Sequence, residues 1–377
     1  MTARARGTGR RVSASLPDFP WDSLADDKRR AAGHPDGIVD LSVGTPVDEV
    51  DPLIRDALYA ASGFPGYPTT LGTAELRSAA AAALSRRYGV AGVDEHAILP
   101  VIGTKEAIAG IVGELGLGPG DTVVIPEIAY PTYEVAALLA GATAVRADSV
   151  GALGSTNPRL IFLNSPSNPT GTVLGIDHLR TVITWARERG VIVVSDECYL
   201  GLTWEGEAAS ILDPRVTDGD LTGLLAVHSL SKISNLASYR AGFLAGDPAL
   251  VAELLAVRKH AGHIVPYPVQ AAMTAALADD EHVDVQRERY RSRRVVLHTA
   301  LRHAGFRVDR SEAGLYLWAT RGEPCRDTVA WLADLGILVA PGDFYGPTAG
   351  QHVRFALTAT DERIAAAAAR LAAAAPD

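Results

Sequence analysis

Short runs of apolar residues alternate with helical patterns through the middle of the chain. Each run is short enough for a buried strand, and the segments between them carry apolar residues at the spacing of one helix face. This alternation is typical of a parallel sheet covered by helices on both faces. The predicted strands lie at 97–101, 122–125, 160–163, 191–195 and 224–228, and the predicted helices at 105–115, 133–140 and 178–189.

The flanking segments follow other patterns. Helices are predicted at 23–32 and 73–88 and a short strand at 38–42, after an extended arm at 16–21. Past residue 266, a long helix (283–304) with an Arg-rich face precedes short strands and two further helices, which is typical of an α+β domain. We expect a disordered basic tail (1–15), an arm joining the small domain (16–44), a large domain (45–265) and a small domain (266–377).

Composition narrows the class of protein. The chain has 377 residues, 47% of them hydrophobic, which fits a folded globular protein. A net charge of −9 argues against a general nucleic-acid partner. Cys198 and Cys325 are the two cysteines, so we expect neither a disulfide framework nor a metal site, and a reducing compartment. No stretch is typical of a membrane span or secretory signal, so no membrane partner and a cytoplasmic location are expected.

A lysine follows the last predicted strand of the alternating region, although lysine prefers a solvated surface. The segment reads His228-Ser229-Leu230-Ser231-Lys232, and Arg240 follows eight positions later. Burial beyond the strand would lower the pKa of the Lys232 amine, as Schiff-base chemistry requires. Ser229 and Arg240 are suited to binding a phosphate. The simpler interpretation is a surface lysine in a loop, which Ser-x-x-Lys alone favours.

Polar residues also follow two other predicted strands. Asp196 comes directly after 191–195, where its carboxylate would pair with a protonated ring nitrogen of a cofactor. Tyr199 would present its phenol to the same ring. The alternative role of Asp196 is a helix N-cap. Asn168 lies in a loop stiffened by Pro166 and Pro169, for which a plain turn is the alternative.

Two weaker features complete the set. Gly103-Thr104-Lys105 joins a predicted strand to a helix, where backbone N–H groups bind phosphate well. Alone this is little more than a glycine turn, and Lys105 is expected to be solvated. Tyr130, held by Pro131, would stack on a planar ring, or else be a core tyrosine.

The order of these features resembles that of the class I/II aminotransferases, the fold type I enzymes of the aspartate aminotransferase superfamily. A phosphate turn, an aromatic, an Asn loop, an Asp at a strand end, and a Lys with an Arg follow one another in that order. The resemblance runs from about Leu16 to the C-terminal helix. It implies an α/β fold with a mostly parallel sheet and a smaller α+β domain. It also implies pyridoxal 5'-phosphate (PLP), amino-acid and keto-acid substrates, and a homodimer with shared active sites.

The resemblance assigns roles to individual residues. Lys232 would bind PLP and serve as the catalytic base, while Asp196 would pair with the pyridine nitrogen. Arg354, in Val353-Arg354-Phe355, would grip the substrate α-carboxylate, with Gly44 leaving room for it. Asn168 and Tyr199 would bond the phenolic oxygen of PLP, and Asn168 would also contact substrate. The other implied cofactor residues are Gly103, Thr104, Lys105, Tyr130, Ser229, Arg240 and, from the neighbouring subunit, Tyr67.

A narrower resemblance concerns the substrate. Stretches at 16–24, 66–70, 258–262, 315–321 and 340–346 are similar to the actinobacterial succinyldiaminopimelate transaminases of lysine biosynthesis. Those enzymes exchange an amino group between N-succinyl-LL-2,6-diaminopimelate and 2-oxoglutarate, so their substrates carry several carboxylates. Lys105, Arg258 and Lys259 are therefore expected to bind distal carboxylates, with Trp21 as a wall of the site.

Two positions depart from the family pattern. Ile233 follows Lys232 where relatives usually have a polar or basic residue, and Ser238 precedes Tyr239-Arg240 where glycine is common. Neither change removes a catalytic group. An aspartate or aromatic aminotransferase, or a PLP-dependent C–S lyase, would share every cofactor residue and stays open. A PLP-binding regulator is not expected, because the span before Leu16 is too short for a DNA-binding domain.

Overall fold

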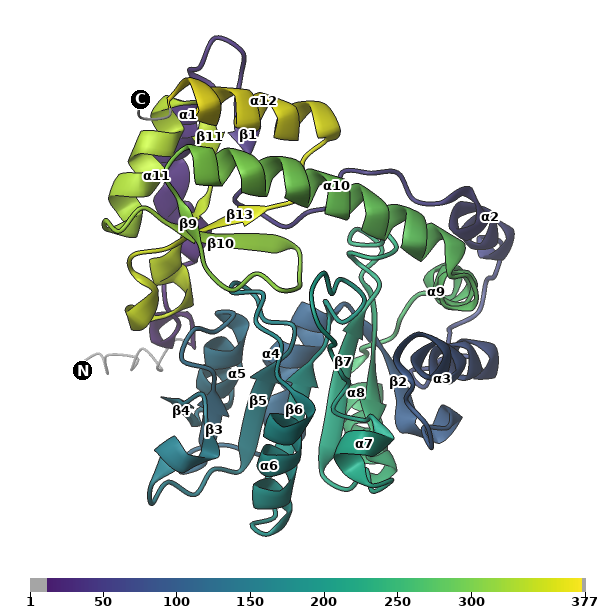
Figure 1. Ribbon diagram of the computed structural model, residues 1–377. Coiled ribbons are helices and arrows are strands. Elements are labelled where there is room, and N and C mark those ends of the chain that lie inside the picture. The colour runs from purple at the N-terminus through teal and green to yellow at the C-terminus, as the bar shows by residue number, and fades with distance from the viewer. Residues whose placement is uncertain (1–11, 375–377) are drawn as a thin grey trace, which may run out of the picture.

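The computed structural model describes residues 12–374 and has two domains, one above the other in Figure 1. The large domain is built around a seven-stranded sheet with the order β2-β8-β7-β6-β5-β3-β4. Its strands are β2 (Ile98–Ile102), β3 (Thr122–Ile125), β4 (Thr143–Arg146), β5 (Leu160–Asn164), β6 (Ile192–Asp196), β7 (Leu224–Ser229) and β8 (Ala241–Gly246). Its helices are α2 (Pro52–Ala61), α3 (Ala74–Tyr88), α4 (Thr104–Glu114), α5 (Thr132–Ala140), α6 (Ile176–Arg187), α7 (Pro214–Thr217), α8 (Pro248–Ala261) and α9 (Tyr267–Ala278).

The sheet is mostly parallel, which confirms the predicted fold class. β8 alone among these strands runs antiparallel to its neighbours, β2 and β7, while the others share one direction. Every strand predicted in the alternating region belongs to the parallel set. β8 escapes prediction because Gly242 and Gly246 weaken its strand pattern. They are needed there, since a Cβ on either would collide with the backbone of β7.

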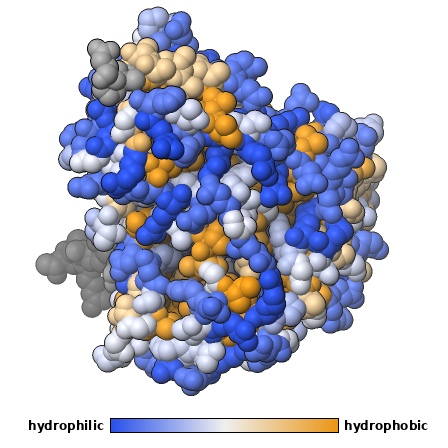
Figure 2. All heavy atoms as spheres, viewed as in Figure 1, coloured by the Kyte–Doolittle hydropathy of each residue, from blue (hydrophilic) through white to orange (hydrophobic). Residues whose placement is uncertain are grey.

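Both faces of the sheet are buried, as continuous apolar runs require. Alternate residues of one strand belong to different core clusters: Val123 and Leu160 pack on one face, Val124 and Ile161 on the other. Helix ends follow local chemistry, since the Thr73 side chain caps α3 and Gly141, with φ +77°, ends α5. The face of the molecule drawn in Figure 2 is largely hydrophilic and is interrupted by apolar patches.

The small domain joins segments from both ends of the chain. An antiparallel sheet has the order β12-β13-β10-β9, and β1 pairs in parallel with β11. Its strands are β1 (Val39–Asp40), β9 (Arg307–Val308), β10 (Tyr316–Thr320), β11 (Ile337–Leu338), β12 (Ala340–Pro341) and β13 (Val353–Ala356). Its helices are α1 (Ala25–Ala32), α10 (Glu281–His303), α11 (Cys325–Asp334) and α12 (Asp361–Ala373).

Three segments differ from expectation. The arm at 16–21 is not wholly extended, because Pro20 begins a 3-10 helix, Pro20–Leu24. Of the expected tail, Val12–Ser15 forms a 3-10 helix and residues 1–11 lie outside the described residues. α9 follows the predicted boundary at 266, yet its Met273 and Leu277 share a core cluster with α3. We therefore propose that the small domain resumes at α10. No helix within residues 12–374 is long and apolar enough to cross a membrane.

Candidate active site

A cavity of about 480 Å3 lies where the carboxyl ends of the parallel strands meet the small domain. Strand register brings these ends together, since Asn164 pairs with Asp196 and Asp196 with Val227. The predicted site residues that line the cavity are Trp21, Gly44, Thr104, Lys105, Tyr130, Asn168, Asp196, Tyr199, Ser229, Lys232, Arg240 and Arg354.

Lys232 lies in the turn that follows β7 and points into this cavity rather than to solvent. Its Nζ donates a hydrogen bond to the carbonyl of Gly44, which also lines the cavity. Burial lowers the pKa of Lys232, and Arg354 and Arg240 add to this, while Tyr316 and Cys198 oppose it. The geometry therefore excludes a surface lysine, and burial shifts this amine toward its neutral form.

Asp196 ends β6 with its carboxylate fully enclosed. Tyr133 donates its hydroxyl to Oδ2 at 2.7 Å, and the Cys198 backbone N–H donates to Oδ1 at 3.1 Å. Burial raises the pKa of Asp196, although these hydrogen bonds partly offset the effect. A turn follows, not a helix, so Asp196 is not a helix N-cap. A buried carboxylate of this kind is suited to pairing with a cationic ring nitrogen.

The phosphate cradle is formed where β2 turns into α4. Gly103 has a φ of +81°, and a Cβ there would collide with the guanidinium of Arg240. Thr104 opens α4, so backbone N–H groups of its first turn face the same end of the cavity as Ser229 and Arg240. Free N–H groups, hydroxyls and a guanidinium together fit a phosphate dianion.

Arg354 is 2% exposed and lies on β13 at the small-domain side of the cavity. Its guanidinium donates to Asn168 Oδ1 at 2.8 Å and to the Ser42 carbonyl at 2.7 Å, and stacks on Tyr316, 3.9 Å from the ring centroid. Burial opposes its charge, but Tyr345, Tyr316 and other tyrosines outweigh burial and raise its pKa. Arg354 is thus a fixed cation beside the Lys232 amine.

Aromatic residues enclose the remaining walls. Tyr130 is half-buried, and burial raises its pKa to about 12. Tyr199 lies 3.0 Å from Tyr316, hydroxyl to hydroxyl, and burial raises the pKa of Tyr199 well above its usual value. Trp21 donates from Nε1 to the Ser42 carbonyl at 3.4 Å and packs on Phe344. Burial thus keeps the phenols of Tyr130 and Tyr199 protonated near neutral pH.

Sequence reasoning missed Tyr133, Tyr316, Ser231 and Cys198, of which the last three line the cavity. Tyr133 and Tyr316 lie within apolar segments, where a tyrosine is more often a core residue. Only the tertiary structure turns their hydroxyls toward Asp196 and Tyr199. Gly44 also has a second role, because a Cβ there would collide with the Tyr316 hydroxyl.

Some predicted residues lie outside the cavity. Tyr67 is 96% exposed on the surface of this single chain. Lys259 is exposed, and Arg258 is fully buried in ion pairs with Glu106 at 2.7 Å and Glu114 at 3.0 Å. The expectation that Arg258 and Lys259 bind distal carboxylates was therefore wrong for this chain. Both carboxylates beside Arg258 belong to the protein itself.

The same cluster bears on metal binding. Ligand atoms of Glu106, Glu114 and His263 lie within 4.8 Å of one another. The Arg258 guanidinium already occupies both carboxylates, and its positive charge opposes a cation there. The cluster is thus explained as an ion-pair network between α4 and α8.

The two departures from the family pattern have clear locations. Ile233 is 7% exposed and packs in the core cluster that contains Tyr290 and Leu317 of the small domain. Ser238 is exposed, and Arg240 still reaches Gly103 with a positive φ of 55° and a hydrogen bond to the Ala237 carbonyl at 2.9 Å.

Comparison with known proteins agrees with this geometry. Residues 36–371 match the family described as aminotransferase class I and II. The chain belongs to the class I and II aminotransferases. It is 68% identical to a protein of Mycobacterium tuberculosis named a probable aminotransferase, over 98% of this chain and 88% of that one. It is 61% identical to the 4-dedimethylamino-4-oxo-anhydrotetracycline transaminase of Streptomyces rimosus, over 94% and 99%.

Solved aminotransferases share the fold. The N-succinyldiaminopimelate aminotransferase of Mycobacterium tuberculosis superposes with a TM-score of 0.87 and 25% identity, over 97% of this chain and 99% of that one. A double mutant of the Thermus thermophilus aspartate aminotransferase gives a TM-score of 0.86, 25% identity and coverage of 98% and 100%. Members of this aminotransferase family use PLP. The cradle at Gly103 and Arg240, the buried Asp196 and the enclosed Lys232 amine fit that cofactor.

Proposed function

We propose that this aminotransferase exchanges an amino group between N-succinyl-LL-2,6-diaminopimelate and 2-oxoglutarate. The observation that supports this most is the placement of cations in the cavity. Arg354 is fixed on one side, while Lys105 lies at the exposed rim on the other and pairs with no carboxylate in the described part of the chain. A substrate with a carboxylate at each end fits such a site.

Different residues of the chain would bind different parts of PLP. Thr104, Ser229, Arg240 and the first turn of α4 would hold the phosphate, and Asp196 the pyridine nitrogen. Tyr130 would cover the ring. When bound, PLP supplies an electron sink for the negative charge that develops at the substrate Cα. Asp196 would support this by pairing with the pyridine nitrogen, since Tyr133 and the Cys198 N–H keep its carboxylate oriented.

The proton transfer belongs to Lys232. An amine whose pKa is lowered by burial is neutral often enough to accept the Cα proton and to deliver it again. Arg354 would hold the α-carboxylate with a planar fork, which fixes the direction of the Cα–H bond toward the amine. Asn168 and Tyr316 orient this fork through a hydrogen bond and a stacked ring.

Lys105 is proposed to bind the distal carboxylate. Its Nζ lies 5.4 Å from the Phe19 ring centroid, so the arm helps to position it. Burial and the positive charge of Arg240 lower the pKa of Lys105. Lys28, also on the cavity wall, lies 3.7 Å from Asp40 and is already paired.

A second candidate is amination of a ketone on a polycyclic aromatic compound. The 61% identical relative is named for such a reaction. The aromatic rim favours it, since Trp21 packs between Phe19 and Phe344 at 5.7 and 5.3 Å between ring centroids. A flat ring system would stack on this surface, whereas a linear dicarboxylate would depend on Lys105.

We also propose a homodimer in which Tyr67 reaches the phosphate site of the neighbouring subunit. The exposed side chains of Tyr59, Phe64 and Tyr67 support this, because exposed apolar surface marks sites of interaction. Tyr267 stacks on Phe64 with the ring centroids 4.0 Å apart, which stiffens this face.

Turnover assays test the proposed substrate. The purified enzyme is supplied with 2-oxoglutarate and, in turn, N-succinyl-LL-2,6-diaminopimelate, aspartate, tyrosine, cystathionine or alanine, and glutamate is measured. The highest kcat/KM is expected with the first. Lys105→Ala should lower kcat/KM for N-succinyl-LL-2,6-diaminopimelate about tenfold, and kcat/KM for alanine much less. Lys259→Ala, on the surface, should change neither kcat/KM. Preference for another donor, or release of ammonia and pyruvate without a keto acid, would contradict the proposal.

A further inference from the structure

One face of α10 changes character along its length. The buried residues at 282, 286, 290 and 293 are polar and repeat every three to four positions, beside a buried valine at 283, whereas those at 297 and 301 are leucines. Leu297 and Leu301 belong to the core of the small domain. The residues at 282, 286 and 290 of this polar half contact the turn that carries Lys232. Figure 1 shows α10 running from the small domain toward α9.

Three contacts tie this polar half to the turn. His282 Nε2 lies 2.8 Å from Ser234 Oγ, and Gln286 Oε1 accepts from Asn235 Nδ2 at 2.9 Å. Tyr290 donates its hydroxyl to the Lys232 carbonyl at 3.3 Å. Burial raises the pKa of Tyr290, so it remains a donor. Ile233 adds apolar contact beside Tyr290.

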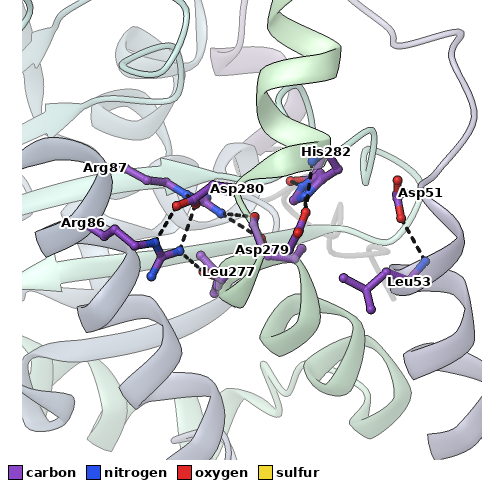
Figure 3. A network of polar contacts seen from close by, with 10 residues as sticks. Asp51, Leu53, Arg86, Arg87, Leu277, Asp279, Asp280 and His282 are labelled. Carbon is purple, nitrogen blue, oxygen red and sulfur yellow. Dashed lines mark hydrogen bonds and ion pairs between the residues drawn. The ribbon is translucent and has the colours of Figure 1, made fainter.

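The start of α10 is itself anchored to the large domain. Asp280 lies between Arg86 and Arg87 of α3, with N–O distances of 2.5 and 2.6 Å, while Asp279 points toward His282 (Figure 3). Asp279 Oδ2 lies 2.6 Å from His282 Nδ1. Since Nδ1 faces a carboxylate, it carries a proton, and Nε2 shares a hydrogen bond with the Ser234 hydroxyl.

Asp279, His282 and Ser234 form a hydrogen-bonded series like the catalytic triad of a hydrolase, but their surroundings do not fit that role. Ser234 is 2% exposed, and its own N–H is bonded to the Leu230 carbonyl. Both Ser234 and Asn235 belong to the turn itself, where Asn235 has a positive φ of 56°. The chain of hydrogen bonds therefore holds a conformation of the backbone instead of activating a nucleophile.

We propose that His282, Gln286 and Tyr290 are positioning residues that hold the Lys232 turn against α10. The proposal rests on the proposed function only in taking Lys232 as the residue that binds PLP. The helix keeps the amine in its enclosed position, where burial lowers its basicity. Because the same helix carries the small-domain core, displacement of that domain is transmitted to Lys232 through the turn.

The test compares holoenzyme variants by the pH midpoint of the visible absorption band of the bound cofactor. Ser234→Ala and Tyr290→Phe each remove one hydroxyl from the contacts between α10 and the Lys232 turn. Each variant keeps the rest of the side chain. Loosening the turn exposes the Lys232 nitrogen to water, which favours its protonated form, so the midpoint should move upward, by about half a unit in the double variant. kcat should fall about tenfold with less than about a twofold change in KM.

Two controls separate positioning from loss of stability. Asp280→Asn weakens the α3–α10 junction without touching the turn, so it should lower the melting temperature and leave the midpoint unchanged. His282→Gln, which keeps an acceptor toward Ser234, should retain more of the wild-type midpoint than His282→Leu.

A wild-type midpoint and kcat in the Ser234→Ala, Tyr290→Phe double variant would overturn the proposal, as would an equal shift in Asp280→Asn. Failure of the proposed function gives a different result. In that case Lys232→Ala would keep the band and its pH dependence.

Discussion

Burial determines the chemistry of single residues in this molecule. Lys232, Asp196 and Arg354 are common surface residues, yet each is enclosed here and paired with a specific neighbour. Sequence reasoning singled them out because each follows a strand or matches a family motif, and all three line one cavity. It could not reveal Tyr133 or Tyr316, whose hydroxyls reach the site only through the packing of distant segments.

Arg354→Lys tests the role of the planar fork. A lysine keeps the charge but cannot make the contacts to Asn168 and the Ser42 carbonyl together with a bidentate grip on a carboxylate. We expect kcat/KM for amino acids to fall on the order of 100-fold, with PLP binding unchanged. Arg326→Lys, an exposed arginine paired with Asp343, should leave kcat/KM unaltered. Equal losses in both variants would contradict the assignment.

Glu197, beside Asp196, gives a pH-dependent prediction. Burial raises its pKa to about 7, and its Oε2 faces His228 Nε2 at 3.4 Å, where burial lowers the pKa of His228 to about 3. Between about pH 4.5 and 7, folded Glu197 holds a proton that the unfolded chain releases, so its contribution to stability falls as pH rises. Glu197→Gln mimics the protonated form.

Chemical denaturation of the holoenzyme at several pH values checks this. The wild type should lose stability relative to Glu197→Gln by roughly 2 kcal/mol between about pH 5 and 8. Glu188→Gln, on the surface, should track the wild type. A difference between wild type and Glu197→Gln that stays constant with pH would show that Glu197 does not titrate in this range.

At the scale of elements, periodicity predicted the parallel strands and most of the helices around them. It failed at β8, where glycines required by close backbone approach hide the strand. It predicted a domain boundary at 266, whereas we propose one after α9, because α9 shares a core cluster with α3. Helix and strand patterns describe which face is buried, not which partner covers it. The turn before α4 is an element whose glycine was correctly singled out.

Gly103→Ala tests the phosphate cradle. A Cβ there would collide with Arg240 in a backbone conformation that L residues rarely adopt. PLP should dissociate at least about tenfold more readily from the variant. Gly116→Ala, at the other end of α4, has a similar φ of +77° and open space around it. It should lose some stability but keep its PLP affinity, as measured by titration of the apoenzyme.

At the scale of the whole molecule, the site lies between two domains and is proposed to be completed by a second copy. Arg354 and Tyr316 come from the small domain, and Asp196 and Lys232 from the large one, so neither domain has the full set. Tyr67, 96% exposed, is separate from both. Net acidity does not conflict with anionic ligands, because the cations act locally inside the cavity.

Mixing two inactive variants tests the shared site. Tyr67→Ala and Lys232→Ala should each have little activity alone. After equal mixing and random reassociation, half of the dimers are mixed, and each contains one site with both residues intact, so activity should recover to about a quarter of the wild type. The absence of recovery, with mixed dimers demonstrated by mass, would show that Tyr67 acts within its own subunit or not at all.

The visible absorption spectrum of the purified enzyme tests the central claim, that Lys232 binds PLP in this cavity for transamination. The wild type is expected to show a yellow band that bleaches when glutamate is added and returns with 2-oxoglutarate. Lys232→Ala should lack the pH-dependent band of the wild type and the return. An unchanged spectrum and unchanged response to glutamate in Lys232→Ala would contradict the account.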